Sequence, residues 1–187
     1  LSDRMNHTAL VYNNMIWVIG GLGNSNVYSK DAYYSTNGIK WTAATPAASW
    51  PARAGHSSVV FDNKMWVLGG FSGGEAEGQV YYSADGANWT QATEDADWQD
   101  RYSFAALVYK NKIWILGGYV GIWPSMNWSN DVWFSNGYNR ILEVLITVCW
   151  KQPDGRMYGE DINLNGRLDG GEDANANGHL DSPAQLR

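Results

Sequence analysis

Asp and Asn side chains recur with a period of 12 residues near the carboxyl-terminal end of the sequence. Residues 160–169 read EDINLNGRLD, and residues 172–181 read EDANANGHLD. Carboxylate and carbonyl oxygens are the ligands that calcium prefers, and a glycine allows the sharp turn that brings several of them around one ion. The two stretches therefore predict calcium sites, and calcium is the cofactor that we expect.

Both stretches resemble the calcium loop of EF-hands and the tandem acidic repeats of thrombospondin type 3 and bacterial surface proteins. In the EF-hand loop, positions 1, 3, 5, 7, 9 and 12 supply the ligands. For the first loop, the resemblance implies ligands from Asp161, Asn163, Asn165, the carbonyl group of Arg167, Asp169 and Glu172. For the second loop, it implies Asp173, Asn175, Asn177, His179 and Asp181.

The second loop is the weaker of the two, because its position 12 is Ala184, which has no carboxylate. One loop ends where the next begins, which leaves no room for the helices of paired EF-hands, so we expect a compact ladder of sites that share carboxylates. Neutral Asn at two ligand positions predicts a Kd of about 10⁻⁴–10⁻³ M, as in extracellular modules. This favours an extracellular or cell-surface location. The alternative is an Asn-, Gly- and Asp-rich linker that binds no metal.

A longer pattern occurs three times before this tail. Each copy opens with an arginine (Arg4, Arg53 or Arg101) and contains a tryptophan three residues before a pair of glycines. The glycine pairs recur after 49 and then 48 residues. An active site would need different residues from different copies. We therefore interpret the repeated arginines, and the equivalent His7 and His56, as structural.

The middle copy predicts four short strands, at residues 56–61, 64–68, 79–83 and 88–91. Asp62-Asn63 predicts the first turn, and the glycine pair at 69–70 is expected to end the second strand. Asp85-Gly86 predicts a hairpin turn that requires a positive φ angle. Four short strands in a unit of about 50 residues are typical of one propeller blade.

This order of elements, with the motif YYSADGANW at 81–89, resembles the Kelch repeat over about residues 4–137. The resemblance implies an all-β protein whose residues 1–140 form propeller blades (repeats 4–52, 53–100 and 101–140). Residues 141–159 would connect the blades to the calcium-binding repeats of 160–187, or add a strand. The third copy departs from the pattern, with Phe104 in place of the histidine and Arg140 where a tryptophan is expected. The sequence therefore does not decide whether the third copy has a fourth strand.

Three blades cannot close a ring, because closed propellers typically contain four to eight blades. Leu1 already lies within the repeat pattern, so we expect either further blades in a longer protein or completion of the ring by another chain, including a homo-oligomer.

Charge and hydropathy argue against nucleic acid as a partner and against a membrane-spanning segment. The net charge is −6 and the isoelectric point about 4.9, so no basic face for nucleic acid is expected. The longest apolar run, residues 141–150, is interrupted by Glu143 and is too short to span a membrane.

Aromatic side chains in loops are the candidates for ligand binding, because they can stack on sugars or anchor a protein partner. Tyr119, Trp123 and Trp128 lie in the long loop of the third copy, which is the least regular part of the pattern. Packing between blades is the alternative role for these residues. It is the favoured role for Trp50 and Trp98, which lie in the connections between copies.

These observations favour a non-enzymatic, secreted or surface binding module that recognises a protein or a glycan and is stabilised by calcium in its tail. A carbohydrate-active propeller enzyme is the first alternative, although no cluster of unrepeated Arg, Glu, His or Tyr can be assembled. Glu75 and Glu77 are acids of one copy without evident partners. The second alternative is a self-assembling extracellular structural protein.

Overall fold

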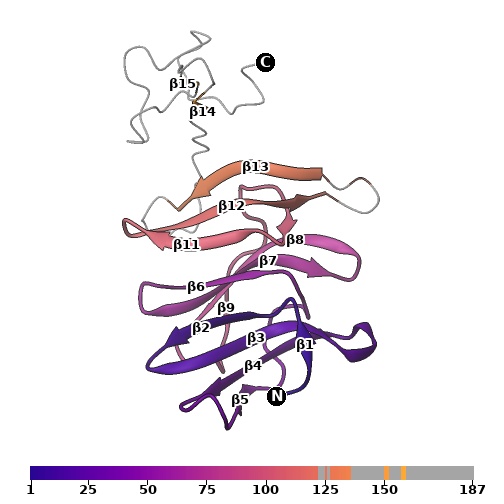
Figure 1. Cartoon of the computed structure of the whole chain (residues 1–187), viewed down its shortest axis with the longest axis vertical. Coiled ribbons are helices and arrows are strands. Elements are labelled where there is room, and N and C mark those ends of the chain that lie inside the picture. The colour runs from indigo at the N-terminus through magenta and orange to yellow at the C-terminus, as the bar shows by residue number, and fades with distance from the viewer. Residues whose placement is uncertain (122–124, 126, 136–149, 152–156, 159–187) are drawn as a thin grey trace.

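The computed structural model describes residues 1–121, 125, 127–135, 150–151 and 157–158. Within residues 1–135, three antiparallel sheets follow one another along the chain and stack face to face, with the second sheet between the first and the third (Figure 1). Each sheet is one propeller blade, and the three blades form an unclosed ring. The chain is therefore all-β, as the repeat pattern predicts. No helix among the described residues is long and apolar enough to cross a membrane.

The first blade carries the lowest residue numbers and contains a 3-10 turn, η1 (Asn24–Asn26), between two of its strands. Its strands are β1 (Arg4–Met5), β2 (Thr8–Tyr12), β3 (Met15–Gly23), β4 (Tyr28–Ser35) and β5 (Thr42–Thr45). Both β1 and β2 pair with β3, so they are one edge strand that is interrupted at Asn6, whose φ is +53°.

The second and third blades repeat this order. The second contains β6 (Ser57–Phe61), β7 (Lys64–Ser72), β8 (Glu75–Ser83) and β9 (Thr90–Thr93). The third contains β10 (Arg101–Tyr102), β11 (Ala105–Tyr109), β12 (Lys112–Val120) and β13 (Asn127–Phe134). The predicted turn at Asp62-Asn63 is confirmed, and so is the positive φ in the second turn, where Gly86 has φ +73°.

The glycine pairs do not end the second strand of each blade, as the sequence had suggested, because β7 continues through Gly69 and Gly70 to Ser72. Both glycines have a positive φ, and the pairing of β7 with β8 shifts register between Leu68 and Gly70. The pair therefore forms a β-bulge inside a nine-residue strand. The third strand is correspondingly longer and begins at Glu75 instead of residue 79.

Apolar side chains from facing sheets and from the connections between them hold neighbouring blades together. Between the first and second blades lie Trp17, Ile19, Trp50, Met65 and Val67. Between the second and third lie Val59, Leu68, Trp98, Phe104 and Ile115. Trp50 and Trp98 are thus buried between blades, which confirms the packing interpretation of these two residues.

Backbone hydrogen bonds also join the blades at the edge strands. The Gly55 amide donates to the Asn6 carbonyl oxygen at 2.8 Å, and the Ser103 amide donates to the Gly55 carbonyl oxygen at 2.7 Å. These three residues occupy equivalent positions, and all have a positive φ. The same local kink therefore links each blade to the next.

The fourth strand of the third blade and the calcium-binding repeats of 160–187 fall outside the described residues. Within the expected connecting segment 141–159, β14 (Trp150–Lys151) pairs with β15 (Met157–Tyr158).

Candidate functional site

The repeated arginines support the backbone of each blade. Arg53 and Arg101 are fully buried. Each of the three donates from Nη1 to the carbonyl oxygen of the first glycine in its own pair, over 2.8–3.0 Å. Arg4 and Arg101 also donate to both carboxylate oxygens of Asp31 and Asp131, respectively. These contacts agree with the structural role inferred from their recurrence.

The middle blade differs at one of these contacts. Gln79 stands where the other blades have Asp, and its Oε1 accepts a hydrogen bond from Arg53 at 2.6 Å. Gln79 in turn donates to Glu94 at 3.1 Å. The Arg53 charge therefore has no carboxylate in direct contact within the described residues, while Glu77 and Glu94 interact with it over a longer range.

His56 lies buried between the first two blades, with its Nε2 2.9 Å from Thr8 Oγ1. Burial lowers the pKa of His56 to about 3, and the nearby Arg53 charge contributes in the same direction. The equivalent His7 is exposed on the outer side of the first blade, and Phe104 fills this position between the second and third blades. A buried, neutral imidazole that phenylalanine can replace belongs to the packing between blades.

The candidate site lies at the end of the blades where β3 joins β4, β7 joins β8 and β12 joins β13. A row of aromatic rings crosses all three blades at this rim, with successive centroids 6.3, 4.9, 5.3 and 6.1 Å apart. We call this set the aromatic row; it consists of Tyr28, Phe71, Tyr102, Tyr119 and Trp128.

Trp128 ends the aromatic row and is the most open of its members, with 82% of its surface exposed. Its ring meets that of Tyr119 edge-on, and Tyr119 stacks on Tyr102 with planes 13° apart. Sequence reasoning singled out Tyr119 and Trp128, and the structure brings them together. They lie on the paired strands β12 and β13, however, and not in a loop as the sequence predicts, because the β12–β13 hairpin extends beyond the glycine pair. Trp123, the third predicted residue, lies outside the described residues.

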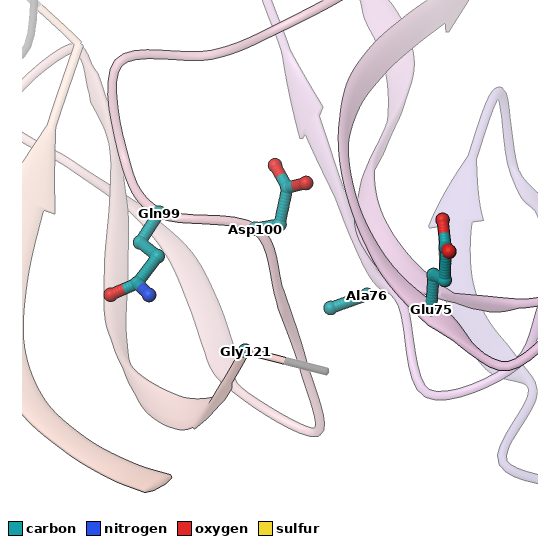
Figure 2. Close-up of a pocket in the computed structure, with 5 residues that line it drawn as sticks. All are labelled: Glu75, Ala76, Gln99, Asp100 and Gly121. Atoms are coloured by element: carbon teal, nitrogen blue, oxygen red, sulfur yellow. The ribbon is translucent and has the colours of Figure 1, made fainter. Parts of the chain in front are cut away.

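An acidic pocket adjoins the aromatic row between the second and third blades. It has a volume of about 250 Å³ and is lined by Glu75, Ala76, Gln99, Asp100 and Gly121. Figure 2 shows Gln99, Asp100 and Gly121 on one side and Ala76 and Glu75 on the other. Ala76 pairs with Phe71 of the aromatic row across the β7–β8 ladder, so the pocket and the row share one rim.

The carboxylates at this rim repel one another. The pKa of Asp100 is raised, first by burial and then by the charges of Asp95 and Glu75. The pKa of Glu77 is also raised, chiefly by burial, although Arg53 opposes the shift. Among the described residues, no Lys or Arg forms an ion pair with Glu75 or Asp100. A cationic group would therefore be stabilised here.

Gly78 makes room for this arrangement. A Cβ atom at that position would lie within 2.3 Å of Asp100 Oδ1, so any larger residue would displace the carboxylate. The need for a small residue beside Asp100 is not visible in the sequence, because Gly78 and Asp100 are far apart along the chain.

Sequence reasoning missed most of the rim. It noted Glu75 and Glu77 without partners, and it did not identify Phe71, Tyr102 or Asp100. One signal was present: the residue after each glycine pair is large and apolar or aromatic in all three copies, as Leu22, Phe71 and Tyr119. Among the described residues, no group of three His, Cys, Asp or Glu side chains is placed to hold a metal ion.

A family model described as the KLHDC2/KLHL20/DRC7 Kelch-repeats domain matches residues 2–158. No curated protein matches the chain. The family match includes all three blades, the aromatic row and the acidic pocket.

Proposed function

The chain belongs to the Kelch-repeat domain family, and on that premise we propose that it is a non-enzymatic binding module whose ligand is a protein segment containing Lys or Arg. The observation that carries this proposal is the combination of the aromatic row with the acidic pocket on one rim. The row offers ring faces for apolar side chains and for cation–π contacts. The pocket offers Asp100 and Glu75 to the cation.

The charge balance of the rim supports a cationic ligand in particular. Asp100 and Glu77 are partly desolvated and lie close to other acids, as their raised pKa values indicate. A Lys or Arg side chain in the pocket would relieve this repulsion. Its hydrogen bonds would also be charge-assisted, which makes them stronger than bonds between neutral groups.

Selection from a library of random peptides tests the proposal. We expect the selected peptides to be enriched in Lys or Arg next to an apolar or aromatic residue. Asp100→Asn should weaken their binding by about tenfold, and Trp128→Ala by a similar factor. Peptide sets without enrichment in cationic residues would contradict the proposal.

Two control variants match these substitutions. Asp62→Asn removes a carboxylate that pairs with Lys64 in the turn between β6 and β7, away from the rim. Ile39→Ala removes an apolar side chain that is 82% exposed, the same fraction as Trp128, from the loop after β4. Both should leave peptide affinity unchanged, and equal losses in control and rim variants would argue for a general effect on the fold.

Binding should weaken as the pH falls. Because the pKa values of Asp100 and Glu77 are raised, these groups take up protons at a higher pH than ordinary carboxyl groups. The charge that attracts the ligand is therefore lost before most surface acids titrate. Anisotropy titrations of a selected peptide at several pH values would show this, and Asp100→Asn should flatten the profile.

A glycan is the second ligand class, favoured by the open ring of Trp128 beside Tyr119. Sugars stack on such faces through their apolar C–H groups. A glycan array run with and without calcium would test it, and the Trp128→Ala variant should lose any signal. Turnover of a bound sugar would instead favour the carbohydrate-active enzyme.

The calcium-binding repeats remain a proposal that rests on the sequence. Two in-register copies of the acidic motif support it, with Asp161 and Glu172 at the first and last ligand positions of the first loop. Calorimetric titration should give a Kd of about 10⁻⁴–10⁻³ M, which Glu172→Gln should weaken. A site of this affinity would fill outside cells, so an extracellular or cell-surface location is part of the same proposal.

A further inference from the structure

The two outermost faces of the three-blade stack expose apolar side chains that are buried elsewhere in the stack. Leu116 on the third blade is 36% exposed, whereas its equivalent in the second blade, Leu68, is 1% exposed. On the first blade, Ile16 is exposed and its equivalent Met65 is fully buried. The difference arises because each inner residue has a neighbouring blade against it and each outer residue does not.

The two outer faces are the two halves of a junction that the chain already makes twice. The outer face of the first blade is equivalent to the face that the second blade turns toward the first. The outer face of the third blade is equivalent to the face that the second turns toward the third. Placed against each other, they would repeat the packing of the two existing junctions.

We propose that these faces bind each other between two copies of this chain, and that the two copies close a six-bladed ring. Six blades lie within the range of four to eight found in closed propellers. The ring would contain two identical junctions, each between the third blade of one copy and the first blade of the other. This inference does not depend on the ligand proposed above.

Polar groups at the outer faces fit the same junction. Between the first two blades, the Tyr12 hydroxyl donates to the carbonyl oxygens of Asn63 and Ala84, at 2.8 and 3.0 Å. Tyr109 is the equivalent of Tyr12 on the third blade, and its side chain is exposed. Its acceptors in the second copy would be the carbonyl oxygens of Asn14 and Thr36, which are equivalent to those of Asn63 and Ala84.

Gly38, at the outer face of the first blade, leaves space for an aromatic ring of a second copy. At the first junction, Gly86 lies so close to Trp17 that a Cβ atom would be 2.1 Å from the ring. Its equivalent, Gly38, has only Ile16 Cδ1 within 4 Å, at 3.9 Å. In the six-bladed ring, Trp114 of the second copy would take the place of Trp17 and lie against Gly38.

The mass of the chain in solution tests the proposal. Light scattering after size-exclusion chromatography should give twice the 20.8 kDa of a single chain. Val11→Asp places a charge on the outer face of the first blade, where Val11 is 68% exposed, and should give the single-chain mass. Val27→Asp, at a 61% exposed position in the rim, is the matched control and should remain a dimer.

Three results would overturn the proposal: a single-chain mass at every concentration, a series of masses larger than two chains, or a dimer that survives Val11→Asp. Circular dichroism of each variant checks that the strands remain. If Val11→Asp lost its strands, Tyr109→Phe would replace it; this variant removes one hydroxyl and should raise the dimer dissociation constant.

Mixing two variants tests which faces meet. Leu107→Glu places a charge on the outer face of the third blade and should also give single chains. A mixture of Val11→Asp and Leu107→Glu should contain dimers, because one of its two junctions is free of both charges. If Leu107→Glu alone stayed dimeric, the first blades would be binding each other, and the head-to-tail ring would be excluded.

Discussion

The buried imidazole of His56 makes the stability of the chain depend on pH. Its pKa is about 3 in the folded chain, against an ordinary value of 6.5. Between these two values the unfolded chain takes up a proton that the folded chain does not. The free energy of unfolding should therefore fall as the pH falls below about 6.5, by up to about 1.4 kcal/mol per pH unit.

The test is urea unfolding of the parent and of His56→Phe at pH 7.5 and 5.5 (about one pH unit either side of the ordinary His pKa). Phenylalanine is the natural choice because Phe104 occupies the same position in the next blade. The variant should lose the part of the pH dependence of the free energy of unfolding that comes from His56. The carboxyl groups contribute equally to both proteins, so their effect cancels in the difference between parent and variant. An unchanged slope would contradict the assignment of a neutral buried imidazole.

Asp85 contributes to stability over a lower range of pH. Its carboxylate accepts hydrogen bonds from the Ala87 and Asn88 amides, and its pKa is lowered to about 2, chiefly by Asn88. Because the folded-state pKa lies below the ordinary value of 3.8, this stabilisation is complete above pH 3.8 and is lost toward pH 2. The effects of His56 and Asp85 can therefore be separated by choosing the pH range.

The glycine bulge is a feature of every blade. Two glycines of the second blade distinguish backbone strain from steric crowding as reasons why a side chain is disfavoured. Gly70 has φ +115°, and a Cβ atom there would lie 2.9 Å from His56 Cβ and 3.1 Å from the Ala54 carbonyl oxygen. Gly74 has φ +103° but nothing within 4 Å of such an atom. Both positions disfavour a side chain through the backbone, and only the first is also crowded.

Gly74→Ala should therefore lower the free energy of unfolding by about 1 kcal/mol, from backbone strain alone. Gly70→Ala should cost roughly 1–3 kcal/mol more, because its methyl group would press on the edge strand of the same blade. Urea unfolding measures both. Equal losses would mean that the edge strand moves freely, and the bulge would then not be a fixed link between the two strands.

The strands could be predicted well from the sequence, because three aligned copies show which features belong to the repeat. The bulge was misjudged for a local reason: a glycine pair usually breaks a strand, and only the pairing partner shows that β7 continues to Ser72. The aromatic row could not be predicted. Its contacts, such as that between Phe71 and Tyr102, join different blades and depend on how the sheets stack.

At the scale of the whole molecule, stability should come mainly from the junctions between blades. Leu68 and Leu116 allow a direct comparison, because they are the same residue at equivalent positions, one inside a junction and one on an outer face. Leu68→Ala should lower the free energy of unfolding by about 2–5 kcal/mol, since it leaves a cavity in a packed interface. Leu116→Ala should cost much less.

Both variants should be measured by urea unfolding in the Val11→Asp background, so that no second copy covers Leu116. A similar loss for the two variants would show that each blade is stabilised mainly within itself. The array would then behave as three independent units instead of one cooperative structure.

The hydrogen bonds through Asn6, Gly55 and Ser103 give the blade array a direction, since the second and third blades each donate an amide to a carbonyl oxygen of the blade before. A duplicated blade inserted anywhere in the series would find both partners already in place. Such a linkage favours evolutionary growth or shortening of the gene by whole repeats, without redesign of the junctions on either side.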